Sequence, residues 1–418
     1  MSPSVTRWDG SAFHTLGCGL HGGTWDCITP GNGGSSSPTT DLEFWNGELY
    51  ACGTFTHSGQ TELNRVARWD GQAWQPLGTG ADGTVSSLRA GPDGLYAGGL
   101  FNQMDTITAL GLARWDGTRW HRVHDLPDIT PVQGTNSIFD LAFYNGMLYI
   151  AGNFKGSLGN SIARWNGSAW EGLPGGALFA GSYSWINRLE VHDGLLYAAG
   201  VFSRDPPDGH PDNPGNSIAA FDGSTWTDLA GGTAGSASHQ VNELLWWHDT
   251  LYVAGSFNAI GGIPSGGLAR WDGQRWCSLV PPGYFDLPTR AIGLFRDSLH
   301  IGGIFTTAGA DSVYRVGVWT GGSTTSGCGP VGVQEEPTVT ATTSLTAWPN
   351  PATDRVQVSG APASARIELI DPLGRVVRRT TSEPAPLWVG DLPRGLYTIV
   401  VHERNGALHG RVRVRLDP

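Results

Sequence analysis

Six short runs of apolar residues and glycine recur along the first three quarters of the chain. They read LYACGTF (49–55), LYAGGLF (95–101), LYIAGNF (148–154), LYAAGVF (196–202), LYVAGSF (251–257) and LHIGGIF (299–305). A run of seven residues that is apolar at nearly every position is typical of a β-strand covered on both faces. The small residues inside each run leave little side chain, which lets a neighbouring sheet approach closely.

A second phrase, LARWDGTRW at 112–120, alternates with these runs. Its aromatic anchor recurs at Trp8, Trp69, Trp115, Trp165, Phe221, Trp271 and Trp319. Alternating residues of a strand face opposite sides, so an even-length loop places Trp115 and Trp120 on the same face of a hairpin. The Asp116–Gly117 pair predicts a tight two-residue turn with positive φ angles.

Each repeat therefore predicts four short strands. In the second repeat they lie at 85–90, 95–101, 111–115 and 119–123. One four-stranded sheet cannot cover both of its faces, and each indole buries roughly 200 Å² when it is covered. Sheets stacked radially would bury one another, so the repeat predicts an all-β fold of the β-propeller type.

The combined phrase LYAGGxF…ARWDGxxWxxLG resembles a Kelch-like repeat of bacterial proteins, over about residues 1–325. The resemblance implies a propeller and says little about function. Propellers of the Kelch group include galactose oxidase, and resemblance to that enzyme implies a copper site with a tyrosine–cysteine crosslink. We cannot match those copper ligands to positions in this sequence. We therefore expect no cofactor.

Six blades fit the repeat best, and seven are the alternative. Residues 5–17 supply only the two outer strands of a blade, and 291–320 supply three strands with no obvious fourth. The segment SAFHTLG (11–17) could complete the last blade and close the ring. A seventh blade that begins upstream of Met1 would explain the same pattern.

Connections on one face of such a ring are short, whereas those on the other are long and unlike one another. Irregular loops on a rigid scaffold often carry binding residues. The candidate ligand contacts on these loops are Trp25, Tyr183, Trp185, Tyr284 and Phe285. The alternative is that these rings pack beneath their own loops.

Other polar candidates have structural interpretations. In four repeats an arginine precedes the motif tryptophan: Arg68, Arg114, Arg164 and Arg270. These arginines could surround a ligand. One arginine per repeat is better explained if each supports the Asp turn of its own repeat or stacks on an aromatic side chain. Asp70, Asp116 and Asp272 are turn residues. An oxygen-rich loop at 203–217 makes a weak calcium site from Asp205, Asp208 and Asp212, without the spacing of known calcium loops. We expect no other metal site and no catalytic residue.

Charge and hydropathy exclude several classes of protein. The net charge is −11, and residues 1–344 hold 30 acidic and 16 basic side chains, a surface that repels nucleic acid. No apolar stretch reaches the ~18 residues of a membrane-spanning helix. The start, MSPSVTRWDG, lacks a secretory signal, and because it lies inside a repeat the true start is expected further upstream.

Five cysteines are present. Cys18 and Cys27 bracket one glycine-rich loop and are spaced for a local disulfide. Cys52, Cys277 and Cys328 leave an odd thiol whatever their pairing, and Cys52 and Cys277 are equally explained as isolated core residues.

The C-terminal part differs in composition. Residues 326–344 form a linker, and residues 345–418 contain alternating segments that predict a small, Ig-like β-sandwich. This stretch resembles the type A C-terminal sorting domain of the type IX secretion system. The motif residues are Pro349, Asn350, Pro351, Asp371, Gly374, Gly395 and Tyr397. The resemblance implies recognition by the outer-membrane translocon, and release or attachment at the cell surface.

The sequence thus favours a secreted or surface-attached propeller that binds a glycan or a protein. An extracellular carbohydrate oxidase or lyase on the same scaffold is the first alternative, and a structural or adhesive surface protein is the second. Titratable side chains converging at the centre of the ring would favour the enzyme.

Overall fold

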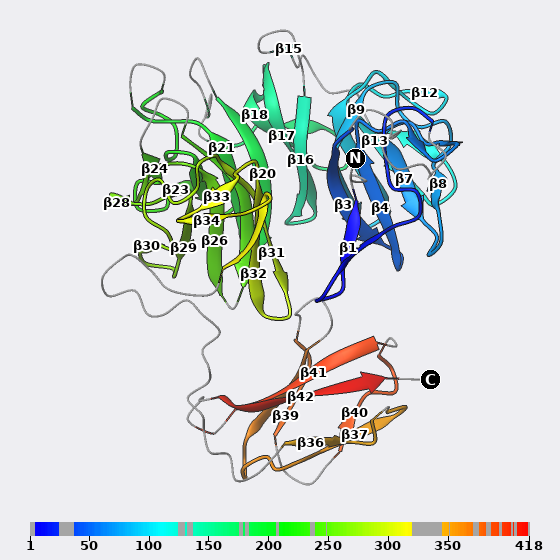
Figure 1. The fold of residues 1–418 in the computed structure, drawn as a ribbon, viewed down its shortest axis with the longest axis vertical. Coiled ribbons are helices and arrows are strands. Elements are labelled where there is room, and N and C mark those ends of the chain that lie inside the picture. Colours follow the sequence, from blue (N-terminus) through cyan, green and yellow to red (C-terminus); the bar gives the residue numbers. More distant parts are fainter. Residues whose placement is uncertain are drawn as a thin grey trace. The chain divides into compact units, whose positions relative to one another are not determined.

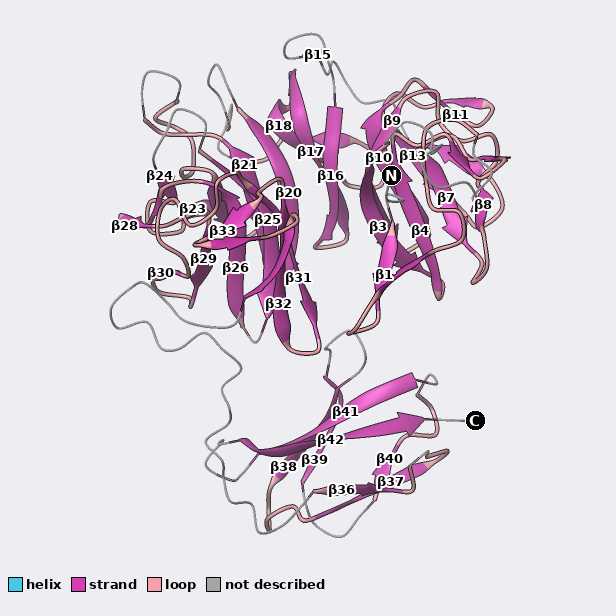
Figure 2. Cartoon of the chain, viewed as in Figure 1, coloured by secondary structure: helices cyan, strands magenta, loops and turns pink. Residues whose placement is uncertain are grey.

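The chain folds into two compact units, Met1–Val333 and Gln334–Pro418, in a computed structural model. It describes residues 5–24, 37–123, 130–131, 137–174, 179, 184–205, 209–234, 239–247, 249–319, 345–350, 352–370, 376–381, 386–392, 395–402, 404 and 408–416. Within those ranges all regular elements are strands (Figure 2), and no helix long and apolar enough to cross a membrane occurs. The fold is all-β, as predicted.

Six antiparallel sheets follow one another along the first unit (Figure 1). The first sheet is β3 (Thr39–Trp45), β4 (Glu48–Gly53), β7 (Val66–Trp69) and β8 (Trp74–Pro76). The second is β9 (Thr84–Gly91), β10 (Gly94–Leu100), β13 (Leu112–Trp115) and β14 (Trp120–Arg122). The third is β16 (Ser137–Tyr144), β17 (Met147–Gly156), β18 (Gly159–Trp165) and β19 (Trp170–Glu171), with β15 (Thr130–Pro131) added on β17.

The remaining three sheets repeat the same order of strands. The fourth is β20 (Trp185–His192), β21 (Leu195–Val201), β22 (Ile218–Phe221) and β23 (Trp226–Asp228). The fifth is β25 (Gln240–Trp247), β26 (Thr250–Ser256), β29 (Leu268–Trp271) and β30 (Trp276–Ser278). The sixth has three described strands, β31 (Thr289–Phe295), β32 (Ser298–Gly303) and β35 (Val316–Trp319).

Successive sheets pack face to face through their first strands: β3 on β9, β9 on β16, β16 on β20, β20 on β25 and β25 on β31. The buried apolar clusters accordingly span neighbouring sheets, as in the one that joins Cys52 and Val66 of the first sheet to Leu88 and Ala97 of the second. Gly98 shows why small residues recur in the second strand. A Cβ built there would lie 2.7 Å from Cγ2 of Ile138 in the next sheet, so a side chain would force the sheets apart.

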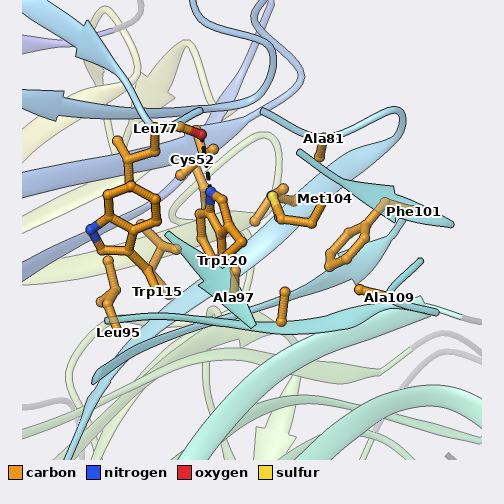
Figure 3. Close-up of a cluster of buried hydrophobic side chains, with 14 of the residues drawn as sticks. Cys52, Leu77, Ala81, Leu95, Ala97, Phe101, Met104, Ala109, Trp115 and Trp120 are labelled. Carbon is orange, nitrogen blue, oxygen red and sulfur yellow. Dashed lines mark hydrogen bonds between the residues drawn. The ribbon is translucent and has the colours of Figure 1, made fainter. Parts of the chain in front are cut away.

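The paired aromatic rings join the third strand of each sheet to the fourth. Trp115 and Trp120 are direct cross-strand partners, with ring centroids 5.4 Å apart. Trp120 is buried, and its Nε1 donates a hydrogen bond to the carbonyl oxygen of Leu77 in the preceding sheet, at 3.0 Å (Figure 3). Equivalent pairs have centroids 4.7–5.5 Å apart: Trp8–Phe13, Trp69–Trp74, Trp165–Trp170, Phe221–Trp226 and Trp271–Trp276.

The turn between Trp115 and Trp120 is longer than the two-residue turn expected from the sequence. Because these two residues are paired, the loop contains four residues, and of its Asp-Gly pair only Gly117 has a positive φ angle, +104°. Oδ1 of Asp116 accepts hydrogen bonds from the N–H groups of Thr118 and Arg119, at 2.8 and 2.9 Å. A carboxylate cap thus replaces the tight turn, which the Asp-Gly pair alone did not indicate.

The N-terminal hairpin, β1 (Thr6–Trp8) and β2 (Phe13–Thr15), does not complete the last sheet. Within the described residues β2 pairs only with β1, and β35 pairs only with β32. This differs from the expected closure through residues 11–17. The aromatic anchors Trp8 and Trp319 end β1 and β35, so each occupies a third-strand position of its own and neither displaces the other.

Four of the connections between second and third strands are regular, although the sequence suggested irregular loops. They contain the two-stranded hairpins β5–β6 (His57–Ser58, Thr61–Glu62), β11–β12 (Gln103–Met104, Ile107–Thr108), β27–β28 (Ala259–Ile260, Ile263–Pro264) and β33–β34 (Thr307–Ala308, Asp311–Ser312). The fifth-sheet hairpin also pairs with β24 (Thr233–Ala234), which follows the fourth sheet. These hairpins therefore tie neighbouring sheets together.

The second unit has two sheets around one apolar cluster. They are β36–β37–β40 (Thr346–Trp348, Arg355–Ser359, Leu387–Trp388) and β39–β38–β41–β42 (Val376–Thr381, Arg366–Ile370, Gly395–His402, Leu408–Leu416). Val356 and Leu387 of the first sheet share that cluster with Leu369, Ile399 and Val414 of the second. The strands lie where the alternating segments predicted them.

Candidate functional site

Charged side chains converge along the first strands of five successive sheets. Each of these strands pairs with its neighbour through a register shift at the same place, and the residue after the shift is polar in sheets one to five. These residues are Asp41, Ser87, Asp140, Arg188 and Glu243. Two residues further on, the same face carries Glu43, Arg89 and Glu190. We call these eight residues the inner polar cluster.

Part of the cluster caps the free edges of the first strands. Oδ2 of Asp41 accepts a hydrogen bond from the N–H of Leu88 at 2.9 Å, and Oδ2 of Asp140 accepts one from Leu189 at 2.8 Å. Oε1 of Glu43 accepts one from Ala90 at 3.2 Å. A first strand has no further strand beside it, so its backbone donors need such partners. Each acid thus reaches across to the next sheet.

Two ion pairs cross the cluster. Nε of Arg188 lies 3.2 Å from Oε1 of Glu243, and Nη2 of Arg89 lies 3.5 Å from Oδ1 of Asp140, whose side chain is only 2% exposed. The Ser87 hydroxyl lies 3.0 Å from Asp140 Oδ1 and 3.2 Å from Asp41 Oδ2. Five carboxyl groups face two guanidinium groups, so the cluster carries a formal charge of −3 when every group is ionised.

This excess of negative charge shifts the acid–base equilibria of the cluster. Burial, together with the carboxylates of Asp140 and Glu243 and against the opposing effect of Arg89 and Arg188, raises the pKa of Glu190 to about 7. Burial also raises the pKa values of Asp41, Glu43 and Glu243. The cluster therefore takes up a proton more readily than an exposed group of carboxylates.

Glu190 differs from the other acids of the cluster. Asp41, Glu43, Asp140 and Glu243 each accept a hydrogen bond from a backbone N–H group. No such bond to Glu190 is found within the described part of the chain. Of the five carboxyl groups, that of Glu190 is thus the one that no backbone donor contacts.

Sequence reasoning missed this cluster, although a signal was present. Asp41, Ser87, Asp140, Arg188 and Glu243 each lie eight residues before the leucine that opens the Leu-Tyr run of their repeat. In the sixth repeat that place is taken by Ala291. Alignment of the repeats on the Leu-Tyr pair brings the charged positions into one column, which a search for local motifs does not do.

The aromatic residues predicted as ligand contacts do not come together at this cluster. Trp25 and Tyr183 lie outside the described residues. Trp185 begins β20 and is half-buried. Tyr284 and Phe285 pack in a cluster under their own loop, with ring centroids 5.1 Å apart, and Phe285 lies 4.7 Å from Phe305. This arrangement matches the alternative in which rings pack beneath their loops.

Three of the repeated arginines form ion pairs with acids other than the turn aspartates, whereas the sequence suggested support of the turn or stacking on a ring. Nη1 of Arg68 lies 2.9 Å from Oε1 of Glu48, which begins β4, and Nη1 of Arg114 lies 3.1 Å from Oδ2 of Asp93, in the turn before β10. Nε of Arg164 lies 3.0 Å from Glu171 on the fourth strand. These are local pairs at the surface of each sheet, and Asp70 and Asp272, like Asp116, cap their own turns.

The predicted calcium loop is only partly described. Asp205 and Asp212 are exposed, and Asp208 lies outside the described residues. Oδ2 of Asp205 accepts a hydrogen bond from Asn216 at 3.3 Å, and Oδ2 of Asp212 lies 3.5 Å from His210 Nδ1. The calcium site stays a prediction.

A different group could present three metal ligands. His192, which ends β20, and Asp193, in the turn that follows, face Asp249 of the fifth sheet, with ligand atoms within 4.8 Å of one another. Both aspartates are exposed, at 84% and 92%, and His192 Nε2 lies 3.8 and 3.7 Å from their carboxylates. The distances also fit ion pairs to a protonated imidazole, so the geometry alone assigns no metal.

The cysteines divide into two kinds. Cys52 is a buried free thiol, and burial raises its pKa well above the ordinary value. Cys18 and Cys277 are disulfide-bonded. Cys27 and Cys328 lie outside the described residues, so the pairing of Cys18 with Cys27 stays a prediction.

The sorting-domain motif binds the first strand of the second unit to its last. Oδ1 of Asn350 accepts a hydrogen bond from the N–H of Arg415 at 2.9 Å, and the N–H of Ala352 donates one to the Arg415 carbonyl at 2.8 Å. Pro349 follows a cis peptide bond, and Tyr397 is buried in the core. Gly395 begins β41, whereas Pro351, Asp371 and Gly374 lie outside the described residues.

Comparison with known proteins identifies the C-terminal part. Residues 346–415 match the family model of the secretion system C-terminal sorting domain. The chain therefore carries a type IX secretion tail, which implies export to the cell surface or the medium. No curated protein matches the chain.

Among solved structures, the chain is similar to PorZ, a bacterial surface component of the type IX secretion system of Porphyromonas gingivalis, at 12% identity and a TM-score of 0.40. The match covers 98% of this chain and 62% of that one, so this chain spans about three fifths of the length of PorZ. It is also similar to the extracellular domain of a one component system from B. thetaiotaomicron, at 9% identity and a TM-score of 0.40, with 92% and 50% covered.

Proposed function

We propose that this protein is an exported binding module, and that the inner polar cluster binds a positively charged group of its ligand. The sorting tail supports export. The six sheets, packed in series through their first strands, support a propeller of Kelch-like repeats with the cluster at its centre. A disulfide between Cys18 and Cys27 would suit such an exported protein.

The formal charge of −3 within the partly buried cluster is the observation that carries this proposal. Two guanidinium groups, of Arg89 and Arg188, are already paired with Asp140 and Glu243. The carboxylates of Asp41, Glu43 and Glu190 are left without an ion pair inside the cluster. A ligand amine would supply the missing positive charge, so an amine on a glycan or on a protein side chain is the chemistry that fits best.

The test uses the full chain and the linear triamine spermidine as the probe, measured by isothermal titration at pH 8. We expect saturable binding of spermidine, and none of triethylene glycol, a neutral chain of similar length. The variant Glu190→Gln removes one charge and should weaken binding at least about tenfold, because an ionic hydrogen bond contributes roughly 1.5–3 kcal/mol. Glu62→Gln, on the exposed strand β6, is the matched control and should bind as the wild type does.

Equal binding of both probes, or no binding of either, would refute the proposal. So would unchanged spermidine affinity in Glu190→Gln, because the assignment of the site rests on this residue. If the chain instead binds a neutral glycan, and Glu190→Gln leaves that binding unchanged, the site lies among the long loops that carry the aromatic residues.

An extracellular carbohydrate-active enzyme, such as a lyase, is the second candidate. One observation favours it: Glu190, with a pKa of about 7, lies among four other carboxyl groups, an arrangement suited to proton transfer. Incubation with a panel of polysaccharides, followed by assay for new reducing ends and unsaturated products, tests it. Activity that is lost in Glu190→Gln supports the enzyme, and absence of products from every polysaccharide opposes it.

A further inference from the structure

Three side chains with metal-binding atoms meet where the turns of the fourth and fifth sheets face each other. His192 ends β20, and Asp193 lies in the turn that follows it. Asp249 lies in the turn between β25 and β26 of the fifth sheet. One ligand atom from each residue lies within 4.8 Å of the other two. Since β20 packs against β25, the group joins two neighbouring sheets.

The imidazole of His192 is held in place by aromatic rings. It stacks on the indole of Trp246 in the fifth sheet, with ring centroids 3.9 Å apart and an interplanar angle of 9°. Tyr197 of the fourth sheet contacts the same indole edge to face, with centroids 5.1 Å apart. A ring fixed in this way loses little further freedom when it binds a ligand, so its nitrogen is preorganised.

The Nε2 atom of His192 is shielded from solvent and has no hydrogen-bond partner within the described part of the chain. The carboxylate oxygens of Asp193 and Asp249 lie 3.8 and 3.7 Å from it, beyond hydrogen-bond distance. A buried polar atom without a partner is costly. A protonated imidazole paired with these aspartates would leave its Nε2–H without a hydrogen bond, whereas a metal ion would bind the nitrogen directly.

The neighbouring pair of sheets makes a direct contact at the equivalent place. Tyr144 ends β16 as His192 ends β20, and its hydroxyl group donates a hydrogen bond to the Gly194 carbonyl in the turn of the fourth sheet, at 2.8 Å. The link between the third and fourth sheets is therefore a hydrogen bond. At His192 the same link needs a bridging group.

The turns themselves do not require aspartate. Asp193 and Asp249 have φ angles of +47° and +54°, a conformation that asparagine also tolerates, and asparagine takes the place of Asp193 at Asn46 and Asn145. Two carboxylates in facing turns repel each other, and a cation between them removes that repulsion. Both side chains are exposed, at 84% and 92%, so they are free to rotate toward such a cation.

We propose that His192, Asp193 and Asp249 bind one divalent transition-metal ion, and that Zn²⁺ fits best. Zn²⁺ binds imidazole nitrogen and carboxylate oxygen at about 2.0–2.2 Å, which places such ligand atoms about 3–4 Å apart. The two distances from Nε2 lie in this range. Ca²⁺ and Mg²⁺ prefer oxygen ligands alone, so the imidazole favours a transition metal.

The bound ion joins the fourth and fifth sheets at the ends of their first strands. Three protein ligands leave a coordination position open to water or to an oxygen atom of a bound molecule. The sequence indicated no metal site here because the ligands come from two different sheets. The site uses none of the eight residues of the inner polar cluster, so failure of spermidine to bind leaves this inference intact.

The test uses the metal-free full chain with ZnCl₂ as the probe, in isothermal titration at pH 7. We expect saturable binding of Zn²⁺ and much weaker binding of Ca²⁺. His192→Phe keeps a ring on Trp246 but removes Nε2, and Asp249→Asn keeps a residue that suits the turn. Each should weaken Zn²⁺ binding at least about tenfold, because loss of even an outer partner of a metal ligand costs about 10–100-fold.

His121→Phe is the matched control. His121 lies 2.6 Å from the carboxylate of Asp116, but it belongs to no group of three potential ligands among the described residues. Its removal should leave Zn²⁺ affinity unchanged. Zn²⁺ should also raise the unfolding temperature of the wild type and of His121→Phe, and not that of His192→Phe, because the ion binds only the folded arrangement of the two turns.

Three results would overturn the inference. The first is that Zn²⁺ does not bind. The second is that either His192→Phe or Asp249→Asn, folded as judged by circular dichroism, binds Zn²⁺ as tightly as the wild type. The third is that Ca²⁺ binds as tightly as Zn²⁺, because the imidazole would then contribute nothing to the site.

Discussion

Trp120 donates its indole N–H to the carbonyl oxygen of Leu77, and this bond joins the fourth strand of one sheet to the segment that leaves the preceding one. The bond is buried, and Trp120 belongs to the same apolar cluster as Leu77 and Trp115. Trp74 and Trp276 make the same bond to Leu16 and Leu229. A repeated tryptophan therefore fixes the distance between sheets and does not merely fill space.

Replacement of Trp120 should destabilise the first unit strongly. We expect Trp120→Ala to lower the free energy of unfolding by about 3–5 kcal/mol, because it leaves a cavity between two sheets. Trp120→Phe should cost less, about 1–3 kcal/mol, chiefly from the unpaired Leu77 carbonyl. Urea denaturation followed by tryptophan fluorescence measures both. Tyr314→Ala, which removes a 97% exposed ring, is the control and should leave the midpoint unchanged.

In the turns between the third and fourth strands, the stability that the aspartate cap provides should depend on its side-chain oxygen acceptor and not on its charge. In the third sheet Asn166 replaces the aspartate, and its Oδ1 accepts the same two N–H groups, of Ser168 and Ala169, at 2.9 and 2.8 Å. We therefore expect Asp116→Asn to keep the unfolding temperature of the wild type. Asp116→Ala should lower it by about 1–3 °C, since both donors lose their partner. An equal loss in both variants would show that the carboxylate charge matters more than the cap.

The raised pKa of Glu190 makes the stability of the first unit depend on pH. Burial raises this pKa from 4.5 to about 7, so between these values the folded state binds more protons than the unfolded state. Stability linked to Glu190 is therefore greatest below about pH 4.5 and is lost as the pH rises to 7. At about 1.4 kcal/mol per pKa unit, the loss is on the order of 3 kcal/mol at most.

Glu190→Gln should remove this dependence. We expect it to stabilise the chain at pH 8 and to change it little at pH 5, as measured by urea denaturation at both values. Glu62→Gln, at an exposed position, should behave as the wild type at both. A variant that is destabilised at pH 8 would show that the ionised Glu190 carboxylate has a partner that stabilises the fold.

The sorting tail should control where the protein is found. We expect a chain without residues 345–418 to fold in its first unit and to stay inside the cell envelope, because the translocon recognises the deleted domain. Fractionation of the native host and immunoblotting measure this. Asn350→Ala is a milder change that removes the acceptor for Arg415 and should reduce export without abolishing synthesis. Surface delivery of the truncated chain would contradict the assignment.

The sequence predicted the strands well because their signals are local. The Leu-Tyr runs predicted strands buried on both faces, and the paired tryptophans predicted hairpins with large rings on one face. Both features are found in the structure. The cluster of Asp41, Asp140 and Glu243 was missed because its members are about 50 or more residues apart and meet only when sheets stack. The number of blades was left open for the same reason, since it depends on how the first and last sheets pack and no local motif reports that.

The pH dependence of spermidine binding tests the central claim most directly, because it joins the charge of the cluster to ligand binding. Aliphatic amines stay protonated between pH 5 and pH 8, whereas Glu190 ionises near pH 7. The account predicts that affinity rises about tenfold or more from pH 5 to pH 8 in the wild type, and that Glu190→Gln flattens this rise. Affinity that is the same at both values, or is higher at pH 5, would contradict it.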